Sequence, residues 1–452
     1  MQEENNRIYL LSKEKVSKAL LKLGIPTMIG MMTSALYNLV DAYFVAGLGT
    51  SQMGAVAVVF PLSLVILGVG LLFGSGASSY LARLLGDKKY KEADKCASTA
   101  LFTSIGVGTV FILSMLMGLM PLLRILGTTD TILPYAKGYA ELFIIGLLIN
   151  IFNITINNIA TAEGATMLSM AAMLAGGIAN IILDPILIYV VGLGVNGAAI
   201  ATLLSRCISA SIFIYYIVGG KSVFHFSIRN IEPSKKVYGE IFKVGIPMLV
   251  YQLLTSVTLS ITNLFAAHFG DFAIASMGVV SRLTSLGGMM IFGFLKGYQP
   301  FVGYNYGAGN MERVKKATRI TLLWTTIFCG VFSLLLVVFA NQIMHAFSKD
   351  DVMVIHTGSK ALIVNGIVFL GLGFQVVYSS MFLALGRAKE GGMISVGRQG
   401  AFFIPLIFLL TALFHLNGLI LAQPVADLCS IIMVFILKTN YEKETKKEGI
   451  YA

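Results

Sequence analysis

Twelve long apolar runs constrain this chain more than any other feature of its sequence. A run of about 20 apolar residues can cross the hydrocarbon core of a bilayer as a helix, which satisfies its own backbone hydrogen bonds. We therefore expect an all-α polytopic membrane protein with twelve transmembrane helices. The runs lie near 23–47, 54–81, 95–120, 132–158, 166–191, 195–218, 241–269, 273–301, 318–343, 353–384, 391–413 and 417–437.

Composition and charge support this class. Charged residues make up 12% of the chain, whereas a soluble domain carries about 25%. The net charge of +11 does not indicate nucleic-acid binding, because Lys and Arg gather in short segments between alternate runs. Cytoplasmic loops have this excess, so both termini are expected in the cytoplasm. The polar N-terminus lacks the short apolar core of a removable signal peptide.

The two halves of the chain repeat each other. Lys22, Gly24, Ile25 and Pro26 recur as Lys243, Gly245, Ile246 and Pro247, a shift of 245 − 24 = 221 residues. The same shift carries Asn196–Gly197 onto Asn417–Gly418. Two six-span halves that both start in the cytoplasm must be parallel repeats, an arrangement typical of transporters with a site near mid-membrane. The predicted organisation is an N-terminal segment (1–22), two six-helix lobes (23–218 and 241–438), a linker (219–240) and a cytoplasmic tail (439–452).

The first run, Gly24–Gly49, carries a carboxylate in its middle. Ser34, Asn38 and Asp41 share one helical face, with Tyr37 beside it. An acid inside a span is costly against lipid, so Asp41 is expected to face a partner, water or a substrate.

Later spans of the first half add more polar groups. Asn150, Asn153 and Asn157 form an amide stripe on the fourth span, and Asn180 and Asp184 lie one turn apart on the fifth. The proline after Asp184 leaves a backbone carbonyl free. Thr202 and Arg206 lie one turn apart on the sixth span. Asp41, Asn180, Asp184 and Thr202 together suit a proton relay or an all-oxygen site for a small hard cation.

The second half lacks this chemistry, because Asp41 maps to Thr262 and Thr202 maps to Gln423. Ion coupling is therefore expected in the first lobe. Arg206 either neutralises Asp184 or extends toward an interface. The remaining intramembrane charges are expected to form packing pairs or to line a pathway; they are Arg282, Lys296 and Asp427.

No cofactor or enzymatic activity is expected. The histidines and the four scattered cysteines show no metal-ligand spacing, and no convincing nucleophile–base set is present. We expect no metal other than a transported Na⁺ at Asp41, Asn180, Asp184 and Thr202, which together are called the first-lobe set.

Three motifs give the chain a resemblance to the multidrug and toxic compound extrusion (MATE) transporters, and within them to bacterial MepA-like members. They are GIPTMIGMMTSALYNLVDAYFVAGLG, the ANIILDP segment at 179–185, and QPFVGYNYGAGN at 299–310. The resemblance implies a V-shaped pair of six-helix bundles in a bacterial cell membrane. It also implies export of cationic, amphipathic drugs in exchange for H⁺ or Na⁺.

The resemblance implies roles for particular residues. In members with an acidic first-lobe cluster, the residues that match Asp41, Asn180, Asp184 and Thr202 form the coupling site. The candidates for lining the substrate cavity are Ser34, Tyr37, Asn38, Asn153, Asn157 and Arg206. We expect a monomer whose partners are small cationic drugs and the lipid bilayer. The nearest alternative is a flippase of the same superfamily that moves a lipid-linked or other amphipathic metabolite, for which Arg206 and Lys296 are the favourable residues.

Overall fold

The computed structural model describes residues 2–348 and 351–447, and every regular element among them is helical. Twelve helices are long and apolar enough to cross a membrane, as predicted. The spans of the first half are α2 (Val16–Ala46), α3 (Thr50–Gly86), α4 (Tyr90–Met117), α6 (Leu133–Ala162), α7 (Thr166–Pro185) continued by the π-helix η1 (Ile186–Val190), and α8 (Val195–Val218). Those of the second half are α9 (Lys235–Ala267), α10 (Asp271–Gly307), α11 (Met311–Val338), α13 (Val352–Phe369), the continuous α15 (Ala388–Val396), η3 (Gly397–Phe402) and α16 (Phe403–Phe414), and α17 (Leu416–Lys447).

Five shorter helices complete the described chain: α1 (Gln2–Ser12), α5 (Leu119–Ile125), η2 (Ile228–Asn230), α12 (Ala340–Phe347) and α14 (Leu372–Ala384). The run predicted as one span at 353–384 is therefore two helices, α13 and α14, with a break at Leu370–Gly371. Gly371 weakens a helix at this point because it lacks a side chain to restrict its backbone.

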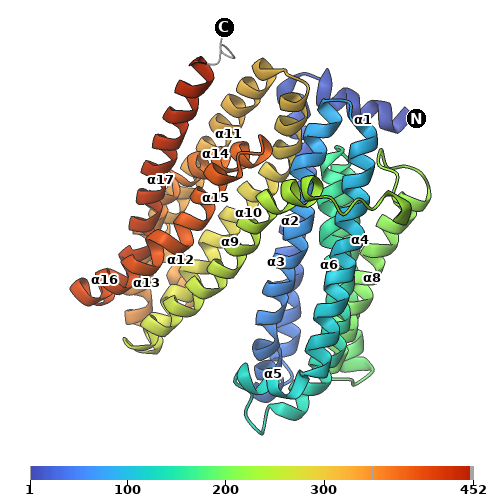
Figure 1. The fold of residues 1–452 in the computed structure, drawn as a ribbon. Coiled ribbons are helices and arrows are strands. Elements are labelled where there is room, and N and C mark those ends of the chain that lie inside the picture. Colours follow the sequence, from blue (N-terminus) through green and yellow to red (C-terminus); the bar gives the residue numbers. More distant parts are fainter. Residues whose placement is uncertain (1, 349–350, 448–452) are drawn as a thin grey trace.

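The helices form two groups that meet near the chain termini and diverge toward the opposite end (Figure 1). Helices α2 to α8 make up one group, the N-lobe, and α9 to α17 make up the other, the C-lobe. Across the junction, α2 packs on α10 and α3 packs on α9 and α10. This is the two-bundle fold expected from the sequence.

Glycines allow the lobes to approach closely at the junction. A β-carbon at Gly86 would lie 2.0 Å from the carbonyl oxygen of Tyr304, and one at Gly245 would lie 1.9 Å from that of Leu72. Only glycine permits such backbone contact between helices, which is common in membrane proteins. An ion pair between Arg83 and Glu240 (2.8 Å) also joins α3 to α9.

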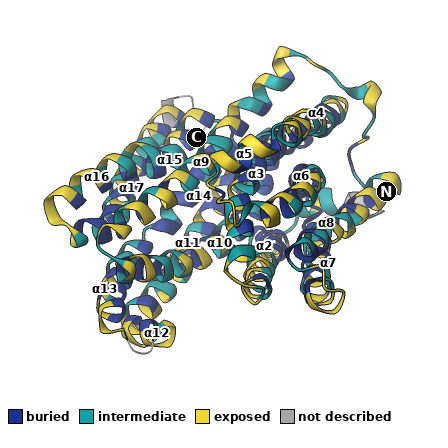
Figure 2. Ribbon diagram, turned by 90° about the horizontal axis from the view of Figure 1, so that it is seen from below, coloured by how far each residue is buried: buried dark blue, intermediate teal, exposed yellow. Residues whose placement is uncertain are grey.

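The outer faces of both lobes are apolar and exposed, as lipid-facing surfaces must be. Figure 2 shows exposed residues along the periphery, for example on α4 and α16. Val110 on α4 and Phe408 on α16 are 66% and 55% exposed, respectively. The structure is that of a multi-pass membrane protein.

Candidate functional site

The predicted first-lobe residues lie on helices that pack together. Asp41 is on α2, Asn180 and Asp184 are on α7, and Thr202 and Arg206 are on α8. Helix α7 packs against both α2 and α8. The structure therefore places these side chains on neighbouring helices of one lobe.

Asp184 is fully buried at the end of α7. The side-chain amide of Asn180 donates a hydrogen bond to one carboxylate oxygen of Asp184 (Nδ2 to Oδ1, 3.2 Å). The second carboxylate oxygen of Asp184 and the amide oxygen of Asn180 are buried and have no hydrogen-bond partner among the described residues. Unpartnered buried oxygens are costly unless a proton, ion or ligand joins them.

Asp41 is half-buried on α2, and its Oδ1 is also buried without a hydrogen-bond partner among the described residues. Its charge interacts with Asp184 and with Arg206. Two carboxyl groups therefore influence each other inside one lobe, each with an oxygen available to a further group.

The break in the fifth span sets the position of Asp184. The chain changes from the α-helix α7 to the π-helix η1 directly after Pro185. Proline lacks the N–H that would continue the regular ladder, and π-helical turns are frequent at functional sites. The hydroxyl of Tyr189 on η1 donates a hydrogen bond to the carbonyl of Phe44 on α2 (2.5 Å), which fixes the two helices beside each other.

Arg206 forms no ion pair with Asp184 in the described part of the chain, although one of the two sequence interpretations had it neutralise that acid. Its guanidinium carbon lies 5.0 Å from the centroid of the Phe143 ring, and its charge interacts with Tyr37, Tyr139 and Asp41. It has no carboxylate within 4.0 Å among the described residues. Arg206 therefore extends into the N-lobe and does not neutralise Asp184 directly.

Two of the predicted asparagines on α6 connect it to other helices. The amide of Asn153 donates a hydrogen bond to the backbone carbonyl of Arg206 (2.9 Å). The amide oxygen of Asn157 accepts a hydrogen bond from the ammonium of Lys296, which belongs to α10 of the other lobe. Asn157 thus connects the N-lobe to the junction, and Lys296 is a pairing residue there.

The remaining cavity candidates make local contacts. Ser34 donates a hydrogen bond to Gly30 (3.3 Å), and Asn38 donates one to Ser34 (2.7 Å), both to backbone carbonyls of α2 itself. Tyr37 lies against Gly177 of α7. Thr202 makes no hydrogen bond among the residues that the structure describes.

The C-lobe has a polar group of different character. Arg398 on η3 forms an ion pair with Asp427 on α17 (Nε to Oδ1, 2.7 Å), and Gln423 donates a second hydrogen bond to the same carboxylate (2.8 Å). Asp427 therefore forms a packing pair with Arg398, which is one of the two roles predicted for it. The sequence reasoning overlooked Arg398, although it is the single charged residue in the run at 391–413.

The sequence reasoning also overlooked Glu163, directly after α6. Its buried carboxylate accepts hydrogen bonds from the backbone of Val223 (2.6 Å), from Ser222 and from Tyr216, and Arg7 of α1 lies 3.9 Å away. No helical periodicity marks this residue, because its partners come from distant parts of the chain.

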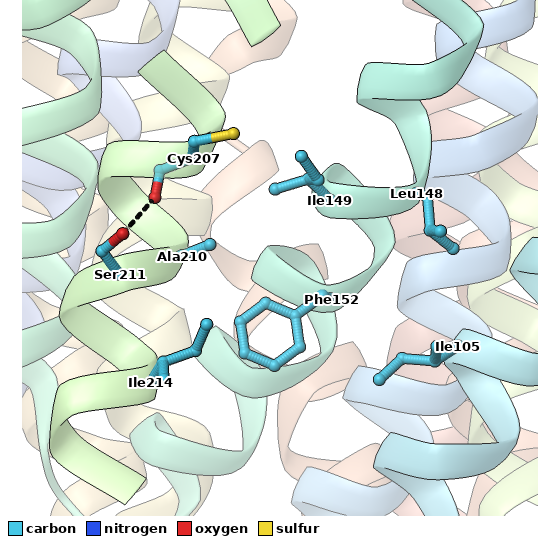
Figure 3. Close-up of a pocket in the computed structure, with 8 residues that line it drawn as sticks. All are labelled: Ile105, Leu148, Ile149, Phe152, Cys207, Ala210, Ser211 and Ile214. Carbon is cyan, nitrogen blue, oxygen red and sulfur yellow. Dashed lines mark hydrogen bonds between the residues drawn. The ribbon is translucent and has the colours of Figure 1, made fainter. Parts of the chain in front are cut away.

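A separate groove of about 360 Å³ lies between α4, α6 and α8 (Figure 3). Its lining is Ile105, Leu148, Ile149, Phe152, Cys207, Ala210, Ser211 and Ile214. The hydroxyl of Ser211 is already bonded to the carbonyl of Cys207 (2.8 Å). The groove offers no charged group, and the acids of the N-lobe do not line it.

No group of three or more His, Cys, Asp or Glu side chains suited to a metal ion occurs in residues 2–348 and 351–447. Asp41, Asn180 and Asp184 offer carboxylate and amide oxygens, the kind of atom that hard cations prefer as ligands.

Comparisons with known proteins agree with the fold. The MatE family model matches residues 26–186 and 247–409, one match in each lobe. The chain is 32% identical to the multidrug export protein MepA of Staphylococcus aureus (strain MSSA476), over 98% of this chain and 99% of that protein. Among solved structures, a MATE protein in complex with MaL6 superposes with a TM-score of 0.92 at 28% identity, over 97% of this chain and 99% of the other. An outward-facing conformation of a multidrug resistance MATE family transporter superposes with a TM-score of 0.91 at 28% identity, over 97% and 98%.

Proposed function

This chain belongs to the MATE family of multidrug efflux transporters, and we propose that it exports cationic amphipathic compounds by antiport with H⁺ or Na⁺, coupled at Asp41 and Asp184. The observation that carries this proposal is the set of unpartnered buried oxygens on Asp41, Asn180 and Asp184. By contrast, the intramembrane carboxylate of the C-lobe, Asp427, is already bound by Arg398 and Gln423. Among the described residues, Asp41 and Asp184 thus keep buried carboxylate oxygens that a transported ion could join, whereas Asp427 is bound on both of its oxygens.

In the proposed mechanism, ion and drug compete for the N-lobe. Ionised Asp41 and Asp184 attract a cationic drug, and binding of H⁺ or Na⁺ to them lowers the affinity for that drug. The ion gradient drives the exchange, because each charge moved through the membrane field is worth about 2.3 kcal/mol per 100 mV. The protein acts as a monomer in the bacterial cell membrane, with both termini in the cytoplasm and the lobes 23–218 and 241–438 moving against each other.

The backbone of α2 supports a hinge near Pro26. This proline removes the hydrogen bond that the carbonyl of Lys22 would accept within the helix. The hydroxyl of Thr166 on α7 donates to that carbonyl instead (3.2 Å). A side-chain hydrogen bond is easily exchanged, so we propose that α2 bends here when Asp41 changes its charge.

The test is drug-dependent ion flux in proteoliposomes, measured once with a pH gradient and once with a Na⁺ gradient. The variants Asp41→Asn and Asp184→Asn are each expected to abolish coupled flux while the protein still inserts. Asp130→Asn is the control, because Asp130 lies on an exposed loop and its pair with Arg124 is outside the site. Normal coupled export by both site variants would refute the proposal.

The second candidate function is a flippase for an amphipathic metabolite that carries an anionic group. Arg206 favours it, because no carboxylate among the described residues lies within 4.0 Å of this guanidinium. Export of a cationic dye that depends on an ion gradient would decide for the antiporter.

A further inference from the structure

Helix α1 lies at the end of the molecule where the two lobes meet (Figure 1). Its Leu11 is fully buried, and a β-carbon placed on Gly164, which follows α6 of the N-lobe, would lie 3.7 Å from the Leu11 side chain. Residues 13–15 separate α1 from the first span, α2. Helix α1 is therefore a separate element that packs against the lobes and is joined to α2 by a short link.

Arg7 attaches α1 to the N-lobe. Its Nη1 donates hydrogen bonds to the hydroxyl of Tyr216 on α8 and to the backbone carbonyl of Lys221 after that helix (3.0 Å). The carboxylate of Glu163, which follows α6, lies 3.9 Å from the same nitrogen. One side chain of α1 thus binds groups at the ends of two N-lobe spans, and hydrogen bonds from a charged donor are stronger than those between neutral groups.

Asn305 and Arg313 attach the C-terminal end of α1 to the C-lobe. The amide of Asn305 on α10 donates a hydrogen bond to the backbone carbonyl of Leu11 (3.0 Å). Arg313 on α11 donates from Nη2 to the carbonyl of Glu14 (2.9 Å), and its Nε donates to the amide oxygen of Asn305 (2.9 Å). Carbonyls at the end of a helix lack partners within the helix and favour a cationic donor. The C-lobe therefore holds this end of α1 with one charged group and one amide.

We propose that α1 is a strap that holds the two lobes together at this end, and that it must leave Asn305 and Arg313 before the lobes separate there. Two-lobed transporters expose their site to each side in turn by moving one lobe against the other. A helix attached to both lobes opposes that movement. Because α1 is joined to α2 of the N-lobe, its attachment to the C-lobe is the one that breaks. The inference rests on the lobe movement proposed above and adds an element that controls it, whichever ion is coupled.

The test measures how often the lobes open at this end, with a thiol placed at the junction. Ser79 on α3 is 1% exposed, and its hydroxyl donates a hydrogen bond to the carbonyl of Leu383 on α14 across the junction (2.5 Å). The parent protein is the full-length chain with Ser79→Cys and with Cys207 and Cys429 replaced by alanine. Its reaction with a polar maleimide is followed in nanodiscs by mass spectrometry. The rate of this reaction reports the population of the open state.

Arg313→Met is expected to raise the labelling rate of this thiol about tenfold, because the closed state loses the hydrogen bonds of a charged donor. Arg319→Met is the matched control, because Arg319 is exposed on the same helix and makes no hydrogen bond to α1 among the described residues. Cys96, which is buried inside the N-lobe, stays unreactive as long as the fold is kept. Equal rates in Arg313→Met and the parent protein, or an equal rise in the control, would overturn the proposal.

The attachment at Arg7 provides a second test. A strap released at either end no longer connects the lobes, so Arg7→Met is also expected to raise the rate about tenfold. The double variant Arg7→Met/Arg313→Met is expected to label within about threefold of the faster single variant, because the second release adds nothing. Two contacts that act independently would instead multiply to about 100-fold, and that result would overturn the proposal.

Lysine variants serve if a methionine variant loses its fold. If Cys96 reacts in a methionine variant, Arg7→Lys or Arg313→Lys replaces it, since lysine keeps the charge but not the several donors of the guanidinium. The lysine variant is expected to raise the rate about threefold, and an unchanged rate overturns the proposal. Labelling needs neither drug nor ion gradient, whereas failure of the proposed antiport appears as absent coupled flux, so the two failures are distinguishable.

Discussion

Glu163 allows a quantitative prediction about stability and pH. It lies outside the spans, directly after α6, and is 1% exposed. Its carboxylate connects α6 to the C-terminal part of α8 through Tyr216 and to the following linker through Val223, while Arg7 brings in α1. The perturbation is Glu163→Gln, which keeps the shape of the side chain and removes its titration.

The magnitude follows from the burial of this carboxyl group. Burial raises the pKa of Glu163 from 4.5 to about 7, although Tyr216, Arg7, Val223 and Ser222 act in the opposite direction. This difference in pKa corresponds to about 3 kcal/mol in the free energy of unfolding. Below pH 4.5 the carboxyl group is protonated in the folded and unfolded states alike. The folded protein then buries a neutral group, and its stability is not reduced by the burial of a charge. As the pH rises from 4.5 to 7, the unfolded state ionises first, so the folded protein progressively loses stability.

The assay is thermal unfolding between pH 4.5 and pH 8, followed with a maleimide dye that fluoresces on reaction with a thiol. Cys96 and Cys329 are fully buried and react only on unfolding. The half-buried Cys207 and Cys429 are replaced by alanine in all variants to keep the baseline low. The wild type is expected to lose stability relative to Glu163→Gln as the pH rises through this range. Parallel pH profiles of the two proteins would refute the reasoning.

Two further predictions concern helix contacts, one inside the C-lobe and one at the junction between the lobes. Asp427→Asn removes the carboxylate that pairs with Arg398, whose side chain is only 15% exposed. This variant is expected to lower the free energy of unfolding by about 3 kcal/mol in the same assay. The double variant Asp427→Leu/Arg398→Met is expected to recover most of the lost stability. If Asp427→Asn alone were as stable as the wild type, the argument would be contradicted. Gly86→Ala places a β-carbon 2.0 Å from the Tyr304 carbonyl oxygen, so it is expected to separate α3 from α10 and to lower the melting temperature. Gly106→Ala is the control, because no atom lies within 4 Å of a β-carbon at that position. Equal melting temperatures of the two variants would show that the junction tolerates the change.

The class of the protein and its division into two repeated halves could be predicted because both depend on local or periodic signals. A run of apolar residues long enough for a bilayer gives a helix whatever its neighbours are. The break between α13 and α14 was not predicted, because the apolar character continues through it while the backbone does not. Helical spacing also placed Asn180 and Asp184 on one face, and the structure joins them by a hydrogen bond.

The pairing of charges could not be predicted in the same way. Arg398 and Asp427 lie on different elements, and Glu163 meets Arg7 of the N-terminal helix α1, which is far from it along the chain. Neither distance follows from spacing along one helix, because each is set by how two helices pack.

By itself, the sequence determined that this chain has twelve spans, that its halves repeat, and that its first half holds two acids, Asp41 and Asp184, on spans whose matching positions in the second half carry none. These properties follow from hydrophobicity, register and residue type, which are present in the chain before it folds. Only the tertiary structure decided which charges are compensated: Asp427 meets Arg398, whereas Asp41, Asp184 and Arg206 keep polar atoms without partners among the described residues. The physical reason is that a buried charge is satisfied or left available by atoms that helix packing brings within a few ångströms.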